Sequence, residues 1–263
     1  MKDILHFSHG NGFPAGSYST LLSYLSDDFD IGVIDRLGHH EDYPVTDNWS
    51  YLVKQLIDFF ESTYSQPVYA VGHSLGGILS MMVAAQRPDL VKGLIMLDAP
   101  LLTAFEAHGL AIVKRLGLMD KVTPSGRTIG RKEEWDSIEQ ASKYFRGKRL
   151  FSDFDDRCLN DYVKNGTQTQ LDGRRRLHFN VDAEISIYRT IPSNLHRTER
   201  LNMPSAVIAA KYSDVFKRHH GHKMKRQLGM NVSWVEGTHM FPLEKPEITA
   251  SLIKKYIASW QKL

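Results

Sequence analysis

The sequence feature that most constrains the fold is a glycine-flanked serine between two apolar runs. Residues 68–71 form a short apolar run, and residues 78–85 form a second one that suits a buried helix. Gly72-His73-Ser74-Leu75-Gly76 stands between them. A strand that turns sharply into a helix strains the backbone at the turn, and the flanking glycines remove side chains that would clash there. The pattern predicts a buried strand, a tight turn that displays Ser74, and a buried helix.

Short apolar strands alternate with amphipathic helices on both sides of this motif. Such alternation indicates a mainly parallel sheet with helices on both faces. We expect core strands at residues 4–8, 31–35, 68–71, 93–97, 206–210 and 232–235, and core helices at residues 18–25, 49–64, 78–85, 215–228 and 248–260. The sequence therefore predicts an α/β fold with about six core strands.

The segment from residue 101 to residue 200 differs from the rest of the chain. It carries 18 Lys and Arg against 14 Asp and Glu, its helices are interrupted by glycine and proline, and it shows no strong strand alternation. We expect residues 1–100 and 201–263 to form one α/β core. Residues 101–200 are then a helical cap or lid inserted between two core strands.

Composition excludes several classes of protein. The whole chain has 33 Lys and Arg against 30 Asp and Glu, a net charge of +3, and no nucleic-acid-binding motif, so we expect no nucleic-acid partner. Pro67 and several glycines interrupt the longest uncharged run, residues 62–86, which argues against a membrane span. Residues 1–6 contain no apolar core of a secretory signal, and Cys158 is the only cysteine. We expect a cytoplasmic protein.

Ser74 has the surroundings of a catalytic nucleophile. A helix that begins just after the serine directs its free N–H groups towards an oxyanion formed there. A second glycine-rich loop, His9-Gly10-Asn11-Gly12-Phe13-Pro14, follows the first expected strand. In an acyl-transfer site, such a loop is the expected source of a second oxyanion N–H group.

On these motifs, the chain resembles the α/β-hydrolase family, in the serine hydrolase and esterase branch that carries a His-Gly oxyanion loop, a Gly-His-Ser-x-Gly-Gly turn and a helical cap. The resemblance covers residues 4–100 and 201–262 and implies the α/β-hydrolase fold. It also implies an oxyanion hole formed by the backbone N–H groups of Leu75 and Asn11. Gly12 is the alternative to Asn11.

The serine needs a base, and the base needs an orienting carboxylate. In this family the histidine follows the last strand, which implies His239 in the run Gly237-Thr238-His239. Two carboxylates follow core strands. Asp214 is preferred because it gives the chain order Ser, Asp, His, and Asp98, at the end of residues 93–97, is the alternative. The resemblance further suggests that His73 faces away from Ser74 and that His9 supports the oxyanion loop.

Two other polar runs have simpler interpretations. His219-His220-Gly221-His222 lies among lysines and arginines with no carboxylate or thiol at a supporting spacing, so a solvated basic helix face is favoured over a metal site. Arg174-Arg175-Arg176 is interpreted first as a solvated turn, with a salt-bridge anchor or an anionic-substrate contact as the alternative. We expect neither a metal nor a cofactor.

The predicted function is a serine hydrolase, a carboxylesterase that cleaves a small-molecule ester through an acyl-enzyme. Thioesterase, amidase and carbon–carbon hydrolase activities use the same triad, and a non-catalytic ligand-binding protein is the alternative from another class. Gly38-His39-His40-Glu41-Asp42 departs from the Gly-x-Gly-x-Ser of many relatives, so the resemblance fixes no substrate. We expect some apolar side chains of the insertion to line an acyl pocket, from the set Phe105, Leu110, Trp135, Tyr144, Phe145, Phe151, Phe154, Tyr162, Phe179 and Tyr188.

Overall fold

The core of the protein is a six-stranded sheet, seen in a computed structural model that describes residues 2–262. The strands are β1 (Asp3–Ser8), β2 (Phe29–Val33), β3 (Val68–His73), β4 (Val91–Leu97), β8 (Ser205–Ala210) and β9 (Asn231–Val235). Their order across the sheet is β2-β1-β3-β4-β8-β9, and every neighbouring pair is parallel. All six strands were predicted, with ends that differ by one or two residues.

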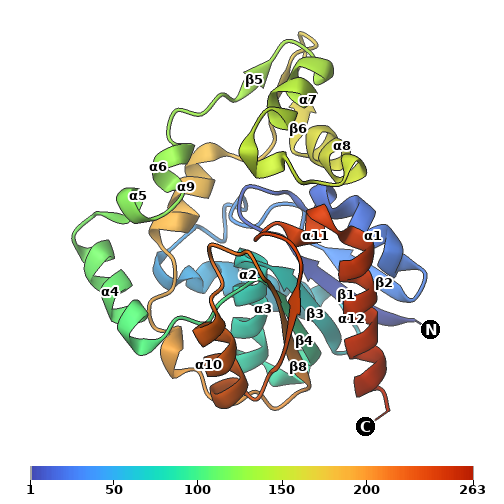
Figure 1. Ribbon diagram of the computed structural model, residues 1–263, viewed down its shortest axis with the longest axis vertical. Helices are drawn as coiled ribbons and strands as arrows, with labels where there is room; N and C mark the ends of the chain where they lie inside the picture. Colours follow the sequence, from blue (N-terminus) through green and yellow to red (C-terminus); the bar gives the residue numbers. More distant parts are fainter. Residues whose placement is uncertain (1, 263) are drawn as a thin grey trace.

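Helices cover both faces of the sheet (Figure 1). The helices α1 (Ser19–Ser26) and α12 (Pro246–Trp260) lie on one face, and α2 (Ser50–Thr63), α3 (Leu75–Gln86) and α10 (Arg218–Leu228) lie on the other. The strand β4 shows why both faces must be covered: Ile95 and Leu97 pack into one apolar cluster, while Leu94 and Met96 pack into the other. Alternate residues of a strand point to opposite faces, so a strand that is apolar throughout needs two layers of helices.

The insertion joins β4 to β8, and most of it lies above the core in the view of Figure 1. Its helices are α4 (Ala104–Arg115), α5 (Met119–Val122), α6 (Ser125–Thr128), α7 (Ile138–Arg146), α8 (Asp156–Asn165) and α9 (Val181–Arg189). It also contains a small antiparallel sheet with the order β5-β7-β6, formed by β5 (Glu134–Trp135), β6 (Thr167–Thr169) and β7 (Arg175–Leu177). The insertion is mainly helical, but this small sheet was not predicted, because strands of two or three residues are too short to show alternation.

Two residues of the arginine run lie on β7, so its interpretation as a turn was wrong, whereas Arg174 and Arg176 are exposed as expected for a solvated run. Arg175 lies on β7 and donates to the Thr167 hydroxyl at 2.9 Å. Arg174 forms ion pairs with Asp172 at 2.6 Å and with Glu134 at 2.9 Å. These contacts agree with the alternative interpretation of the run as a salt-bridge anchor.

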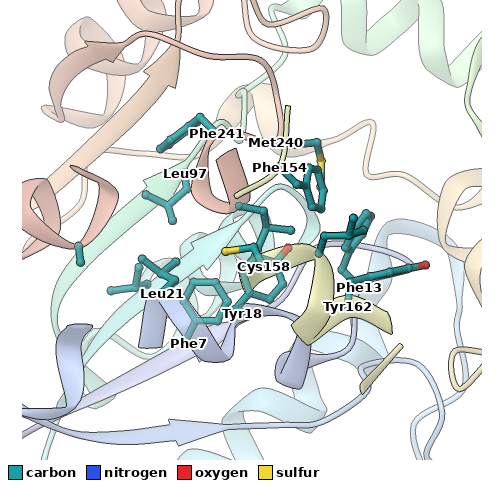
Figure 2. Packing of buried hydrophobic residues seen from close by; sticks show 14 of the residues in the cluster. Phe7, Phe13, Tyr18, Leu21, Leu97, Phe154, Cys158, Tyr162, Met240 and Phe241 are labelled. Atoms are coloured by element: carbon teal, nitrogen blue, oxygen red, sulfur yellow. The ribbon is translucent and has the colours of Figure 1, made fainter. Parts of the chain in front are cut away.

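The insertion and the core share one apolar cluster. Figure 2 shows Phe13 and Met240 of the core close to Phe154 and Tyr162 of the insertion. The Phe13 and Tyr162 ring centroids are 4.9 Å apart. A polar contact adds to this packing, because the Asp161 carboxylate of α8 accepts hydrogen bonds from the backbone N–H and hydroxyl of Thr20 on α1. The insertion is therefore held against the core by buried contacts as well as by its two connections.

None of the helices within residues 2–262 combines the length and the hydropathy that a membrane crossing requires. The helix α3, which follows the serine turn, has 12 residues. The expected cytoplasmic location stays a prediction.

Candidate active site

Ser74 stands at the turn between β3 and α3 in a strained backbone conformation. Its φ is 53° and its ψ is −115°, a region that residues with a Cβ rarely adopt. A Cβ on Gly76 would lie 2.0 Å from the Ser8 carbonyl oxygen, and one on Gly72 would lie 2.3 Å from the Gly76 carbonyl carbon. Both glycines are needed because α3 approaches the end of the sheet so closely. The glycine pattern that identified the turn thus has a direct steric cause.

His239 comes from the loop after β9, just before α11 (Phe241–Glu244), as predicted. Its Nε2 atom lies 3.0 Å from the Ser74 hydroxyl oxygen. Its Nδ1 atom lies 2.7 Å from a carboxylate oxygen of Asp98. A carboxylate accepts the Nδ1 proton, which leaves the lone pair of Nε2 facing the serine hydroxyl.

Asp98 is the residue that reaches His239, so the preference for Asp214 was wrong about the geometry. Asp98 directly follows β4 with a positive φ of 46° and is fully buried. Its other carboxylate oxygen accepts a hydrogen bond from the Ala210 N–H at 2.7 Å, and the Ser213 hydroxyl also donates to the carboxylate. Each oxygen has at least one donor, which makes a buried carboxylate tolerable without a cationic neighbour.

Asp214 faces solvent because its neighbour Ser213 turns inwards. The buried Ser213 hydroxyl donates to Asp98 and accepts hydrogen bonds from the N–H groups of Val215 and Phe216. This local turn holds the Ser213 hydroxyl against the Asp98 carboxylate and directs the next side chain outwards. Asp214 is exposed and has no hydrogen-bonding partner among the described residues.

A chain of hydrogen bonds connects the loop after β1 to the loop that carries His239. The Gly10 N–H donates to the Tyr18 hydroxyl at 3.2 Å, and that hydroxyl lies 2.7 Å from Nδ1 of His73. Nε2 of His73 lies 2.9 Å from the backbone carbonyl oxygen of His239. A carbonyl oxygen only accepts, so His73 carries its proton on Nε2, and its Nδ1 accepts a hydrogen bond from the Tyr18 hydroxyl. Burial, with the nearby His239 ring, holds the pKa of His73 well below its usual range and keeps the ring neutral.

The loop after β1 brings backbone N–H groups next to Ser74. Asn11 and Gly12 line the same cavity as Ser74 and His239, and Gly12 has a φ of 79°. Among the described residues, no protein acceptor receives the N–H groups of Asn11 and Leu75. His9 supports this loop as expected: its Nδ1 donates to the Gly10 carbonyl at 2.8 Å, and its Nε2 accepts from the Leu37 N–H at 2.8 Å.

A buried acid, Glu184 of α9, packs against this loop, and no sequence motif indicated it. Its carboxylate lies 2.9 Å from where a Cβ on Gly12 would stand. Burial raises the pKa of Glu184, and its ion pair with Arg131 at 2.6 Å opposes that rise. The Glu184 carbonyl also accepts from the Asn11 side-chain amide at 3.0 Å. The partners of Glu184 come from distant segments, which is why no local pattern surrounds it.

A cavity of about 730 Å³ lies over Ser74 and His239. Residues of the loop after β1 and of the insertion form most of its walls. Of the apolar side chains expected to line a pocket, five do so: Tyr144, Phe145, Phe151, Tyr162 and Tyr188. Trp135, Phe154 and Phe179 are buried in packing instead, Leu110 lies outside the lining, and Phe105 is 88% exposed.

The histidine run on α10 has a partner that its sequence neighbourhood did not reveal. Glu106 of α4 lies 2.9 Å from Nε2 of His219 and 3.1 Å from Nε2 of His220, and His220 is buried. The interpretation of this run as a solvated face is therefore wrong for His220, whereas His219 and His222 are exposed. These three side chains lie close enough to hold a metal ion.

The protonation of His220 fits a polar link better than a metal site. Nδ1 of His220 accepts a hydrogen bond from the Lys217 N–H at 3.0 Å, so its proton is on Nε2, the atom that faces Glu106. A metal at that atom would have to displace the proton. We conclude that Glu106 ties α4 of the insertion to α10 of the core.

Comparison with known proteins identifies the family. Residues 7–252 match the model of the alpha/beta hydrolase family, so the chain belongs to that family. The mouse monoglyceride lipase is 29% identical over 138 residues, which are 49% of this chain and 45% of the lipase. The (E)-2-((N-methylformamido)methylene)succinate hydrolase of Acinetobacter baylyi is 26% identical over 132 residues, 48% of this chain and 50% of that enzyme. These matches span about half the length of each curated relative.

Solved structures support the fold over almost the whole chain. The crystal structure of E-2-(acetamidomethylene)succinate hydrolase superposes with a TM-score of 0.77 and covers 98% of this chain and 91% of its own, at 22% identity. The α/β-hydrolase fold and the resemblance to hydrolases of the esterase and lipase type are thereby confirmed.

Proposed function

We propose that this member of the α/β-hydrolase family is a serine hydrolase that cleaves a carboxylic ester with Ser74, His239 and Asp98. One observation carries the proposal: the Ser74 hydroxyl, the His239 ring and the Asp98 carboxylate form a continuous hydrogen-bonded row with separations of 3.0 and 2.7 Å. The relatives named above are hydrolases, among them a monoglyceride lipase. Their substrates are not assigned to this chain.

The first half of the reaction follows from the protonation of this row. Nε2 of His239 takes the proton of the Ser74 hydroxyl as its oxygen attacks the ester carbonyl. The imidazolium that forms is stabilised by the Asp98 carboxylate on Nδ1. The carbonyl oxygen becomes an oxyanion, and the free N–H groups of Leu75 and Asn11 supply hydrogen bonds that strengthen as its charge develops.

The second half returns the enzyme to its starting state. His239 gives its proton to the leaving alcohol, and the acyl group stays on the Ser74 oxygen. Water then enters, loses a proton to Nε2 of His239 and attacks the acyl carbon. The carboxylic acid leaves and the Ser74 hydroxyl re-forms. Each proton that leaves one group in this sequence is taken up by another.

The insertion has the place of a cap in this proposal. Its residues form most of the walls of the cavity above Ser74, so they decide which acyl and alcohol groups fit. Closing the site from bulk water also strengthens the hydrogen bonds at the oxyanion. The expected domain division, with residues 101–200 as the cap, is part of this proposal.

Hydrolysis of p-nitrophenyl butanoate by the purified protein tests the proposal. We expect Ser74→Ala and His239→Ala each to lower kcat by roughly 10⁴-fold or more, because triad members act as a unit. Ser213→Ala, which leaves the triad itself intact, should retain far more activity. A folded wild-type protein that hydrolyses neither this ester nor its thioester or amide analogues would contradict the proposal and favour a ligand-binding protein.

A further inference from the structure

Cationic side chains gather around the cavity that holds Ser74. Arg127, Arg131, Lys132, Lys148 and Arg149 all line it, and Glu184 is the only acidic side chain among its described lining residues. All six come from the insertion. The basic excess of the insertion, visible in its composition, is therefore concentrated around the candidate active site.

One of these cations, Arg131, forms an ion pair with Glu184. The Glu184 carboxylate pairs with Arg131 at 2.6 Å and also accepts a hydrogen bond from the Thr128 hydroxyl at 3.2 Å. The other four, Arg127, Lys132, Lys148 and Arg149, form no ion pair with any described residue. No carboxylate within residues 2–262 pairs with these four side chains, so the cavity carries an excess of positive charge.

Other arginines of the insertion show that carboxylate partners are available there. Arg146 pairs with Asp156, Arg157 with Asp155, and Arg189 with Asp120, at distances from 2.5 to 2.9 Å. These pairs lie outside the cavity lining. Lys143 and Lys164 of the insertion also form no ion pair with any described residue, but they lie outside the lining. The cavity differs because it brings four unpaired cations to one concave site.

An aromatic wall lies directly beside the cations. The Lys148 ammonium lies 4.4 Å from the centroid of the Tyr144 ring, and the Lys132 ammonium lies 5.9 Å from it. Tyr144 itself lines the cavity. A ligand that fills this space meets an apolar surface and unpaired positive charge together.

We infer that the substrate of this site is an amphiphilic anion: an ester with an apolar portion and a carboxylate or phosphate group that meets Arg127, Lys132, Lys148 and Arg149. The inference rests on the proposed function and adds the substrate class. Clustered like charges in a concave site raise the local concentration of oppositely charged ligands. Arginine and lysine both bind carboxylate and phosphate by charge-assisted hydrogen bonds.

Matched pairs of esters test the inference. One pair, p-nitrophenyl hydrogen adipate and its methyl ester, differs by a charge on the acyl side. The other, p-butanoyloxybenzoate and its methyl ester, differs by a charge on the alcohol side. In at least one pair we expect kcat/KM to be about tenfold higher for the anion at low salt, with most of this preference lost in molar salt because exposed charges are screened.

Two double variants connect the preference to the lining cations. Lys148→Ala/Arg149→Ala and Arg127→Ala/Lys132→Ala should each reduce the anion preference, the ratio of the two kcat/KM values, by about threefold, the usual size for a few solvent-accessible charge contacts. Lys143→Ala/Lys164→Ala is the matched control. Both of its lysines are exposed on the insertion and lie outside the cavity lining, so the ratio should stay the same.

The outcomes separate this inference from the proposed function. If Ser74-dependent hydrolysis occurs but both pairs show a ratio near one, the inference is wrong and the proposed function stands. If no ester is cleaved, the proposed function fails, and calorimetric titration of p-butanoyloxybenzoate into Ser74→Ala decides the inference. Salt-sensitive binding that is lost in Lys148→Ala/Arg149→Ala would support it, and equal or no binding of the anion and its methyl ester would overturn it.

Discussion

At the scale of single residues, the most informative position is Asp98. It follows β4 in a left-handed backbone conformation, and its carboxylate lies between the Ala210 N–H, the Ser213 hydroxyl and His239. A backbone strain of this kind persists only where the surrounding structure fixes it. Ser74 and Asp98, both strained, follow neighbouring strands of the sheet, so the fold uses the same means twice to aim a side chain at His239.

Asp98→Asn should lower kcat by around 10³- to 10⁴-fold, because the amide no longer favours the histidine tautomer that accepts the serine proton. Asp214→Asn should change kcat by less than about twofold, as for an exposed residue without partners. Steady-state kinetics on one ester compares the two variants directly. A larger loss in Asp214→Asn would show that the carboxylate acting in solution is not the one that contacts His239 here.

The lowered pKa of His9 makes the stability of the fold depend on pH. His9 is fully buried, and burial lowers its pKa to about 4 from an ordinary value of 6.5. Below pH 6.5 the unfolded chain binds a proton at His9 that the folded chain refuses, so stability falls as the pH drops from about 6.5 to about 4. The difference in pKa corresponds to on the order of 3 kcal/mol over that window.

Urea unfolding from pH 7 to pH 4.5 measures this effect. His9→Gln, whose side-chain oxygen can still accept the Leu37 N–H, should lose stability less steeply with falling pH than the wild type. His222→Gln, at an exposed position, should keep the wild-type slope. Equal slopes in the wild type and His9→Gln would contradict the assignment of a neutral buried His9.

Site residues that belong to a contiguous sequence motif were predicted from the sequence, and those positioned by distant contacts were not. Ser74 and its glycines form a contiguous motif, and His239 follows a recognisable strand in a fixed chain order. The carboxylate has no such motif, because Asp98 and Asp214 both follow core strands. The inward turn of Ser213 separates them, and this turn depends on hydrogen bonds from residues 215 and 216 that no sequence spacing announces.

At the scale of elements, the contact between α3 and the sheet sets the position of Ser74. A Cβ on Gly76 would meet the Ser8 carbonyl oxygen at 2.0 Å, whereas a Cβ on Gly109, in the middle of α4, would have no described neighbour within 4 Å. The two glycines therefore offer a matched comparison of helix propensity with and without a steric clash.

Gly76→Ala should destabilise the protein and lower activity, because α3 must move away from β1. Gly109→Ala should stabilise the protein by up to about 1 kcal/mol, the usual gain from replacing glycine in a helix. Thermal unfolding, with ester hydrolysis as a second readout, compares them. A Gly76→Ala variant with unchanged stability and activity would show that α3 does not approach the sheet so closely.

The strands of the core could be predicted from the sequence, and the strands of the insertion could not. The inner strands β3, β4 and β8 are buried apolar runs, the edge strands β2 and β9 are only partly buried, and all the core strands were found from sequence. The strands β5, β6 and β7 have two or three residues each, and their pairing depends on Arg174 and Arg175 contacts with distant partners. Such short strands carry no periodic signal, so the small sheet could not be predicted.

At the scale of the whole molecule, the insertion and the core together enclose the cavity over Ser74. We expect the insertion to select the acyl group. Leu150→Ala, at a lining position, should change the ratio of kcat/KM for short and medium acyl esters by up to about tenfold, because one methylene in such a pocket is worth about 1 kcal/mol or more.

Phe105→Ala is the control for this prediction, since Phe105 is 88% exposed on α4 and lies outside the cavity lining. It should leave the acyl-length profile unchanged. A profile that moves in Phe105→Ala but not in Leu150→Ala would place the selecting surface outside this cavity.

The central claim, that Ser74 is a nucleophile activated by His239, is tested most directly by locating a covalent adduct. The protein is treated with a fluorophosphonate probe, digested, and analysed by mass spectrometry. We predict one phosphonylated residue, Ser74, with labelling abolished in Ser74→Ala and strongly slowed in His239→Ala. Labelling at another residue, or a fully folded wild-type protein that remains unlabelled, would contradict the claim.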